Sequence, residues 1–286
     1  FFFSLVLPVA LSIAVAFFLF QGFIEQQRER ELQTELKNEA RNLSFEVRTL
    51  REYTLMLALD PEMQAALSRQ MGDRPETTRE AFSEIIFRKG TLVRDVSHIS
   101  LYGRDLSAIY PGVDQAGGSS AGGWTGPVFR HASQNVAWLL APDRGEASLI
   151  VRVRGVPNPV HDVTFLTDLG YVEVRSRGLF DSAAARNSAA ADNPKLVFDA
   201  HRGVVRQITG ERSANVDAAL TSIVDAGAPI GESLEIGPLT YNVTRYPIEG
   251  TDWTLVQLIT DAALRFGAMT MLYYGAIILL GLVLVV

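Results

Sequence analysis

Few residues in this chain have the types and spacing needed for catalysis. Residues 118–122 read Gly-Ser-Ser-Ala-Gly, which is the G-x-S-x-G spacing of a hydrolase nucleophile elbow. Such an elbow needs a buried apolar strand before the serine and a helix after it. Here polar and glycine-rich segments, residues 113–117 and 123–126, flank the motif. The pattern therefore predicts a loop and no catalytic serine.

Metal, thiol and cofactor chemistry also lack support in the sequence. The chain has no Cys, which leaves the redox compartment open. Its histidines are scattered without the paired spacing of metal ligands: His98, His131, His161 and His201. We expect no catalytic residue, no metal site and no cofactor in this segment.

Ligand binding is the chemistry that the aromatic and arginine residues favour. Trp124, Arg130 and Trp138 lie around the longest loop, and Arg152 and Arg154 share one face of the next strand by period-two alternation. Aromatic walls and guanidinium groups suit a small anion or carboxylate. The alternative is that Trp138 is a core residue, Trp124 caps the loop and the arginines face solvent.

The net charge of −6 argues against a nucleic-acid partner, which would need clustered cationic residues. Two apolar segments, residues 1–24 and 265–286, are predicted to span a membrane. A signal peptide cleaved after Ala14-Val15-Ala16 is the alternative for the first, but cleavage there would leave an apolar stub. Two spans would place residues 25–264 outside the cytoplasm. We expect an excerpt whose cytoplasmic output domain lies beyond Val286.

Residues 25–70 are predicted to form one long signalling helix that continues from the first apolar segment. Apolar positions recur at alternating spacings of four and three: Leu36, Ala40, Leu43, Val47, Leu50, Thr54 and Leu57. This stripe either packs on the chain's own domains or pairs with the same helix of a second copy in a homodimer. The two interpretations are compatible along different stretches of the helix.

Two sets of strands follow, and each begins with a strand, a tight turn containing glycine and a second strand. The repeat predicts two antiparallel sheet domains in tandem, residues 71–185 and 186–262, and an α+β fold. The first set has a helix at 79–87 and strands at 96–102, 106–110, 147–153 and 170–175. The second has strands at 195–199, 204–208, 231–236, 239–246 and 253–259, with a helix at 216–226. Trp253 is predicted to fill the core between the second sheet and the long helix.

Three segments resemble the double Cache (PAS-like) sensor region of bacterial receptors: LVFDAHRGVV (196–205), DLGYVEVRSRGLF (168–180) and GTDWTLVQLI (250–259). The resemblance implies a periplasmic or extracellular sensor for a small molecule. It also implies coupling to a histidine kinase, a methyl-accepting signalling domain or a nucleotide cyclase.

Many amino-acid-binding members of this family use an arginine with aromatic residues and an acid near the strand that closes the domain. Here His131 follows Arg130 and Arg175 occupies that strand, so the sequence departs from the pattern for amino acids. The nearest acids are Asp168 and Glu173, of which Asp168 joins the predicted ligand-binding set. Two alternatives stay open: a partner-binding or structural module without its own ligand, and a membrane-tethered enzyme.

Overall fold

The computed structural model describes residues 2–70, 75–90, 96–110, 129, 134–141, 146–155, 168–176, 178–180, 194–199, 204–209, 221, 233–236, 239–260 and 273. The G-x-S-x-G segment at 118–122, predicted to be a loop, and the predicted helix at 216–226, apart from Thr221, lie outside these residues. Among the described residues, no helix has both the length and the apolar character needed to cross a membrane. The second expected span, 265–286, lies outside the description apart from Tyr273.

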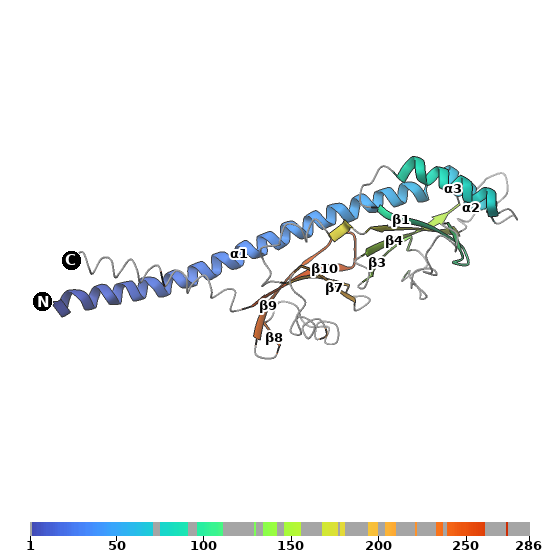
Figure 1. Ribbon diagram of the computed structural model, residues 1–286. Coiled ribbons are helices and arrows are strands. Elements are labelled where there is room, and N and C mark those ends of the chain that lie inside the picture. Colours follow the sequence, from blue (N-terminus) through green and yellow to red (C-terminus); the bar gives the residue numbers. More distant parts are fainter. Residues whose placement is uncertain are drawn as a thin grey trace. The chain divides into compact units, whose positions relative to one another are not determined.

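The helical part of the chain begins with one very long helix, which is the blue ribbon of Figure 1. The helices are α1 (Phe2–Ala58), α2 (Pro61–Gln70) and α3 (Pro75–Gly90). The single helix predicted for residues 25–70 is therefore two helices. Proline disfavours helical geometry at the residue before it and suits the first position of a new helix. Asp60 caps that new helix, because its Oδ1 accepts hydrogen bonds from the backbone N–H of Glu62 (2.8 Å) and Met63 (3.1 Å).

Two five-stranded antiparallel sheets follow, as the strand patterns predict. Sheet A has the order β2-β1-β5-β4-β3 and sheet B has the order β7-β6-β10-β9-β8. The strands of sheet A are β1 (Val96–Gly103), β2 (Ala108–Tyr110), β3 (Val136–Ala141), β4 (Glu146–Arg154) and β5 (Asp168–Ser176). Those of sheet B are β6 (Lys195–Asp199), β7 (Val204–Thr209), β8 (Ser233–Ile236), β9 (Leu239–Pro247) and β10 (Trp253–Thr260). A short 3-10 turn, η2 (Gly178–Phe180), follows β5. The α+β class is confirmed, whereas strand β3 was not predicted.

The chain divides into two compact units. The A unit comprises Asn42–Ala185 and Ile248–Asp252, and the B unit comprises Phe1–Arg41, Arg186–Pro247 and Trp253–Val286. Helix α1 contributes its first part to the B unit and its last part to the A unit. The tip between β9 and β10 belongs to the A unit, although both strands belong to the B unit.

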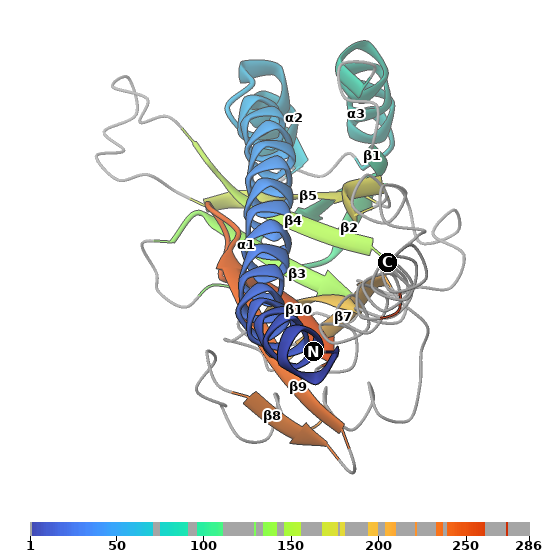
Figure 2. The same cartoon turned by 90° about the vertical axis from the view of Figure 1, so that its left-hand side faces the viewer.

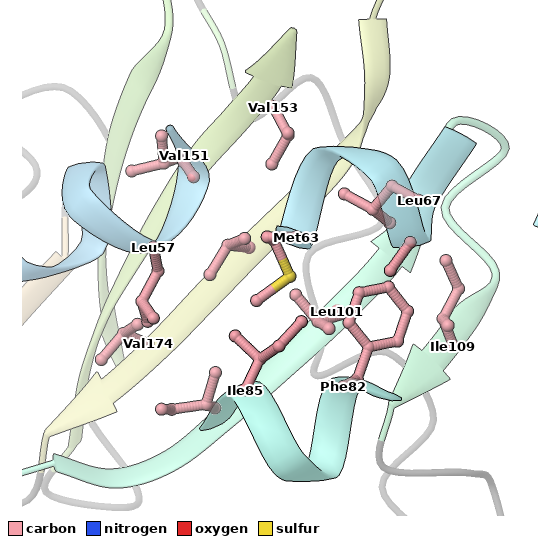
Figure 3. Close-up of a cluster of buried hydrophobic side chains, with 14 of the residues drawn as sticks. Leu57, Met63, Leu67, Phe82, Ile85, Leu101, Ile109, Val151, Val153 and Val174 are labelled. Atoms are coloured by element: carbon pink, nitrogen blue, oxygen red, sulfur yellow. The ribbon is translucent and has the colours of Figure 1, made fainter. Parts of the chain in front are cut away.

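In the A unit, one face of sheet A is covered by helices. Figure 3 shows Met63 and Phe82 between the helices and the sheet, beside Leu101, and it shows Leu57 beside Val174. Strands β5, β4 and β3 lie side by side in sheet A (Figure 2). The predicted heptad stripe is buried within the single chain, because its members from Leu36 to Leu57 are at most 3% exposed. This confirms, for these residues, that the stripe packs on the chain's own domains.

In the B unit, a buried lysine joins sheet B to α1. Lys195, 1% exposed, donates from Nζ to Glu39 Oε2 (2.6 Å) and Glu35 Oε1 (3.0 Å), both on α1. The other face of sheet B is apolar, with Leu196, Phe198, Tyr241, Val256 and Leu258 in one cluster. Trp253 is 1% exposed, so its predicted burial is confirmed, and its Nε1–H donates to Asp199 Oδ2 at 3.3 Å.

Candidate ligand-binding face of sheet A

The face of sheet A that points away from the helices carries charged and hydroxyl side chains. Val151, Val153, Val172 and Val174 belong to the helix-covered core. Because side chains alternate along a strand, the residues between them point to the opposite face. We call this opposite face the polar face of sheet A. Its charged and hydroxyl-bearing members are Ser100, Tyr102, Ser148, Arg152, Arg154, Tyr171, Glu173 and Arg175, with Asp168 at its end. The same face also holds a small apolar cluster, in which Ala137 and Ile150 are buried beside Tyr102, with Phe129 and Leu139 packed against them.

Strand register brings these side chains into rows across the sheet. Tyr171 of β5 is paired with Tyr102 of β1 on one side and with Arg152 of β4 on the other. In the next row, Glu173 lies between Ser100 and Ile150. Residues from three strands therefore meet on one surface. Tyr102 and Glu173, which touch there, are 71 positions apart in the sequence.

Glu173 is the centre of the inner part of this face. Its side chain is only 2% exposed, and both of its oxygens are bound. Arg175 donates from Nε to Oε1 (2.9 Å) and from Nη2 to Oε2 (3.1 Å), while the Tyr102 hydroxyl donates to Oε2 at 2.7 Å. Two guanidinium bonds and a phenol bond compensate the loss of water around this carboxylate.

Tyr102 stays protonated under ordinary conditions. Burial, followed by the charge of the Glu173 carboxylate, raises the pKa of Tyr102 to about 12. The hydroxyl therefore acts as a fixed hydrogen-bond donor on this face. It holds Glu173 in one orientation together with Arg175.

Arg152 forms the outer part of the face. Its guanidinium carbon lies 4.6 Å from the centre of the Phe129 ring, and that ring stacks on Tyr171 at a centroid distance of 5.8 Å. Arg152 Nη1 is 3.5 Å from Asp168 Oδ2, and Arg154 Nε donates to Asp168 Oδ1 at 3.1 Å. Two arginines thus share the Asp168 carboxylate at this corner.

The five predicted ligand-binding residues do not all lie together in the structure. Arg152 and Asp168 are brought together on the polar face. Trp138 lies on the opposite face, packed against the helix-covered core, and its Nε1–H donates to Gly250 O at 3.1 Å. It is therefore not part of the candidate site. Trp124 and Arg130 lie outside the described residues.

Sequence reasoning missed Tyr102 and Phe129 as members of the site, and it named Glu173 as a nearby acid without including it in the ligand-binding set. The run Tyr-Val-Glu-Val-Arg in residues 171–175 alternates strictly, which is a signal that Glu173 and Arg175 share a face. Nothing in that run indicates that Glu173 is buried, because its partner Tyr102 comes from another strand. Within the described part of the chain, no group of three metal-ligating side chains is found.

Comparison with known proteins gives likeness in structure alone. No protein-family model matches the chain, and no curated protein matches it in sequence. The sensor domain of the V. cholerae histidine kinase DctB is similar with a TM-score of 0.47 and 12% identity, over 82% of this chain and 99% of that chain.

Two further solved structures are similar over most of their length. The ligand-binding domain of Mlp24 with asparagine has a TM-score of 0.44 and 12% identity, over 87% of this chain and 97% of that one. The periplasmic domain of RsbU from Chlamydia trachomatis has a TM-score of 0.41 and 14% identity, over 85% and 98%. The DctB structure is that of a sensor domain, and the Mlp24 structure is that of a ligand-binding domain.

Proposed function

We propose that this chain is the extracytoplasmic ligand-sensing region of a transmembrane signalling receptor. In this proposal a small molecule with an anionic group binds to the polar face of sheet A. The two apolar segments at residues 1–24 and 265–286 span the membrane. The second of them passes ligand occupancy to a cytoplasmic output domain.

The observation that carries the proposal is the buried, fully bound Glu173 on the sheet face opposite the apolar core. Burying a charge is unfavourable unless partners compensate it, so a protein that needs only stability is better served by apolar residues there. Side chains held in one geometry by such partners are typical of binding sites. Glu173, Tyr102 and Arg175 therefore supply a rigid floor beside Arg152.

The charges on this face support an anionic ligand. Among the described residues, this face carries three guanidinium groups, on Arg152, Arg154 and Arg175, and two carboxylates, on Asp168 and Glu173. A guanidinium has five N–H donors in a planar arrangement, so Arg152 can contact a carboxylate while it keeps Asp168 and the Phe129 ring as neighbours. The side chains of Arg154 and Asp168 are 24% and 31% exposed, which puts the open end of the face at this corner.

Homodimerisation is the second part of the proposal. Because the heptad stripe is buried within the chain, a second copy has to use the opposite face of α1. Phe45 (60% exposed) and Met56 (41% exposed) lie on that face. Phe45→Lys with Met56→Lys should reduce the mass seen in sedimentation of the purified chain, and an unchanged mass would exclude this dimer surface.

A thermal-shift screen of the purified chain against carboxylates, amino acids, sugars and purines tests the ligand. A ligand at about a hundredfold over its dissociation constant stabilises the folded state by roughly 2.7 kcal/mol, which raises the melting temperature by several degrees. We expect hits among the anions that Arg152→Ala abolishes. Arg51→Ala, at an exposed position of α1, should keep them. A ligand site on this face would be contradicted if no compound raised the melting temperature. It would also be contradicted if the compounds that raise it did so equally in Arg152→Ala.

A further inference from the structure

The tip that joins β9 to β10 is unusual because it does not belong to the same compact unit as its strands. Ile248–Asp252 belong to the A unit, whereas Leu239–Pro247 and Trp253–Thr260 belong to the B unit. The tip therefore packs with the A unit, and β10, the central strand of sheet B, begins directly after it.

Two hydrogen bonds from different elements of the A unit hold the tip. Ser44 of α1 accepts from the backbone N–H of Glu249 through its Oγ at 2.9 Å. Trp138 of β3 donates from its indole Nε1–H to the carbonyl oxygen of Gly250 at 3.1 Å. Ile248, 1% exposed, anchors the start of the tip by its apolar side chain.

The conformation of the tip depends on Gly250. This residue has φ of +86°, the left-handed region that glycine occupies without a steric penalty. Val47 of α1 lies close by, since a Cβ on Gly250 would be 3.8 Å from its Cγ1. The backbone thus passes over α1 with its carbonyl directed at Trp138.

Both hydrogen bonds lie at exposed positions, where water competes for the same donors and acceptors. Contacts of this kind open at lower free energy than contacts in a core. The tip is therefore suited to two states: a docked state, in which both hydrogen bonds are made, and a released state, in which both are broken.

Strand β3 connects this tip to the polar face. β3 is an edge strand that pairs with β4, and the backbone N–H of Arg152 on β4 donates to Asn135 O at 2.8 Å. Trp138 follows three positions later on the opposite face of the same strand. A shift of β3 caused by Arg152 would act on the indole that holds Gly250.

We propose that the β9–β10 tip is a latch in which Trp138 and Ser44 release together, and that the position of β3 sets its state. The latch controls whether Glu249 and Gly250 stay bound to α1 and β3. This inference concerns a coupling between two contacts, so it can be tested with or without a ligand on the polar face.

Amide hydrogen exchange on the purified full chain provides the test. Trp138→Phe keeps an aromatic ring but removes the indole N–H. If the tip is a latch, exchange at the Glu249 amide should accelerate at least tenfold in this variant. The Trp138 indole bonds to Gly250 O, whereas the Glu249 amide bonds to Ser44, so independent bonds would leave that exchange rate unchanged. Ser68→Ala, which deletes an exposed hydroxyl bound to Gln64 O in α2, is the matched control and should change neither contact.

Ser44→Ala gives the reciprocal measurement, because coupling between two contacts acts equally in both directions. Exchange at the Trp138 indole N–H should then accelerate by a similar factor. If each variant affects only its own contact, the two bonds are independent and the latch is excluded. Should Trp138→Phe also loosen the amides of β5 in the core, the Ser44→Ala measurement alone decides, with an unchanged indole overturning the proposal.

Discussion

In both sheets the strands have the same spatial order, with the first strand of each set between the second and the fifth. They differ in where they place buried charge. Sheet A carries Glu173 and Arg175 on the face turned away from its helices, while its helix-covered face is apolar. Sheet B carries Lys195 on the face that meets α1, while its other face is apolar.

This difference separates two uses of a buried ion pair. Lys195 uses its charge to attach a strand to a helix, so its partners are fixed parts of the fold. Glu173 and Arg175 use theirs on a face where the helices do not pack, beside the more exposed pair of Arg154 and Asp168. One topology thus supports an attachment in the B unit and a candidate binding surface in the A unit.

The largest effect is expected from Lys195→Met, which removes the attachment in sheet B. Removing one partner of a buried ion pair leaves Glu39 with an uncompensated charge and should lower the free energy of unfolding by about 3–5 kcal/mol. Urea unfolding of the wild-type chain and the variant measures this loss. Arg88→Met breaks an exposed pair with Glu62, in which both side chains are more than half exposed, and should lose less than about 1 kcal/mol. Equal losses in the two variants would show that Lys195 is not an attachment of this kind.

A smaller effect, visible only at high pH, is expected from Tyr102 in sheet A. The pKa of Tyr102 is raised to about 12 by burial and by Glu173, whereas an unfolded tyrosine titrates near roughly 10. The folded state favours the protonated phenol. Its contribution is therefore fully present below about pH 10 and is lost as the pH rises toward about 12.

A shift of about two pKa units corresponds to about 3 kcal/mol. The wild-type chain should thus lose up to that much stability between about pH 10 and 12 beyond the loss seen in Tyr102→Phe. Urea unfolding at several pH values in this range measures the difference. Parallel curves for the two proteins would show that Tyr102 does not donate to a charged Glu173, and the polar face would then lack its inner floor.

The sequence predicted most of the strands because hydrophobic alternation is a local property. Strand β6 was placed at its observed bounds, and β1, β4, β5, β9 and β10 within one or two residues. Strand β3 was missed because Val-Ala-Trp-Leu-Leu-Ala is apolar throughout and shows no period of two. The break between α1 and α2 was missed because apolar spacing continued across Asp60 and Pro61, and the local chemistry of the cap outweighed it.

The candidate site was harder to predict than the strands. Arg152 and Arg154 were placed on one face correctly from alternation, and Asp168 was chosen as a nearby acid. That Arg152 and Asp168 meet depends on the register between β4 and β5, which includes an irregularity at Val153 and Arg154. Trp138 was assigned to the site because it lies near a loop in sequence. Its side of the sheet follows only from the existence of β3.

The smallest change in stability is expected from Arg154→Ala, and it sharpens the comparison between the sheets most directly. The ion pair of Arg154 with Asp168 is partly exposed, so its loss should lower the free energy of unfolding by less than about 1 kcal/mol. If the outer corner of sheet A serves binding and not stability, the same variant should still weaken the anion found in the thermal-shift screen. Calorimetric titration should then show a dissociation constant raised about tenfold, since one charged contact contributes roughly 1.4 kcal/mol or more.

Lys195→Met should show the reverse, with a large loss of stability and an unchanged dissociation constant measured below its melting temperature. A variant of Arg154 that loses stability but binds the anion normally would place sheet A in the same structural role as sheet B.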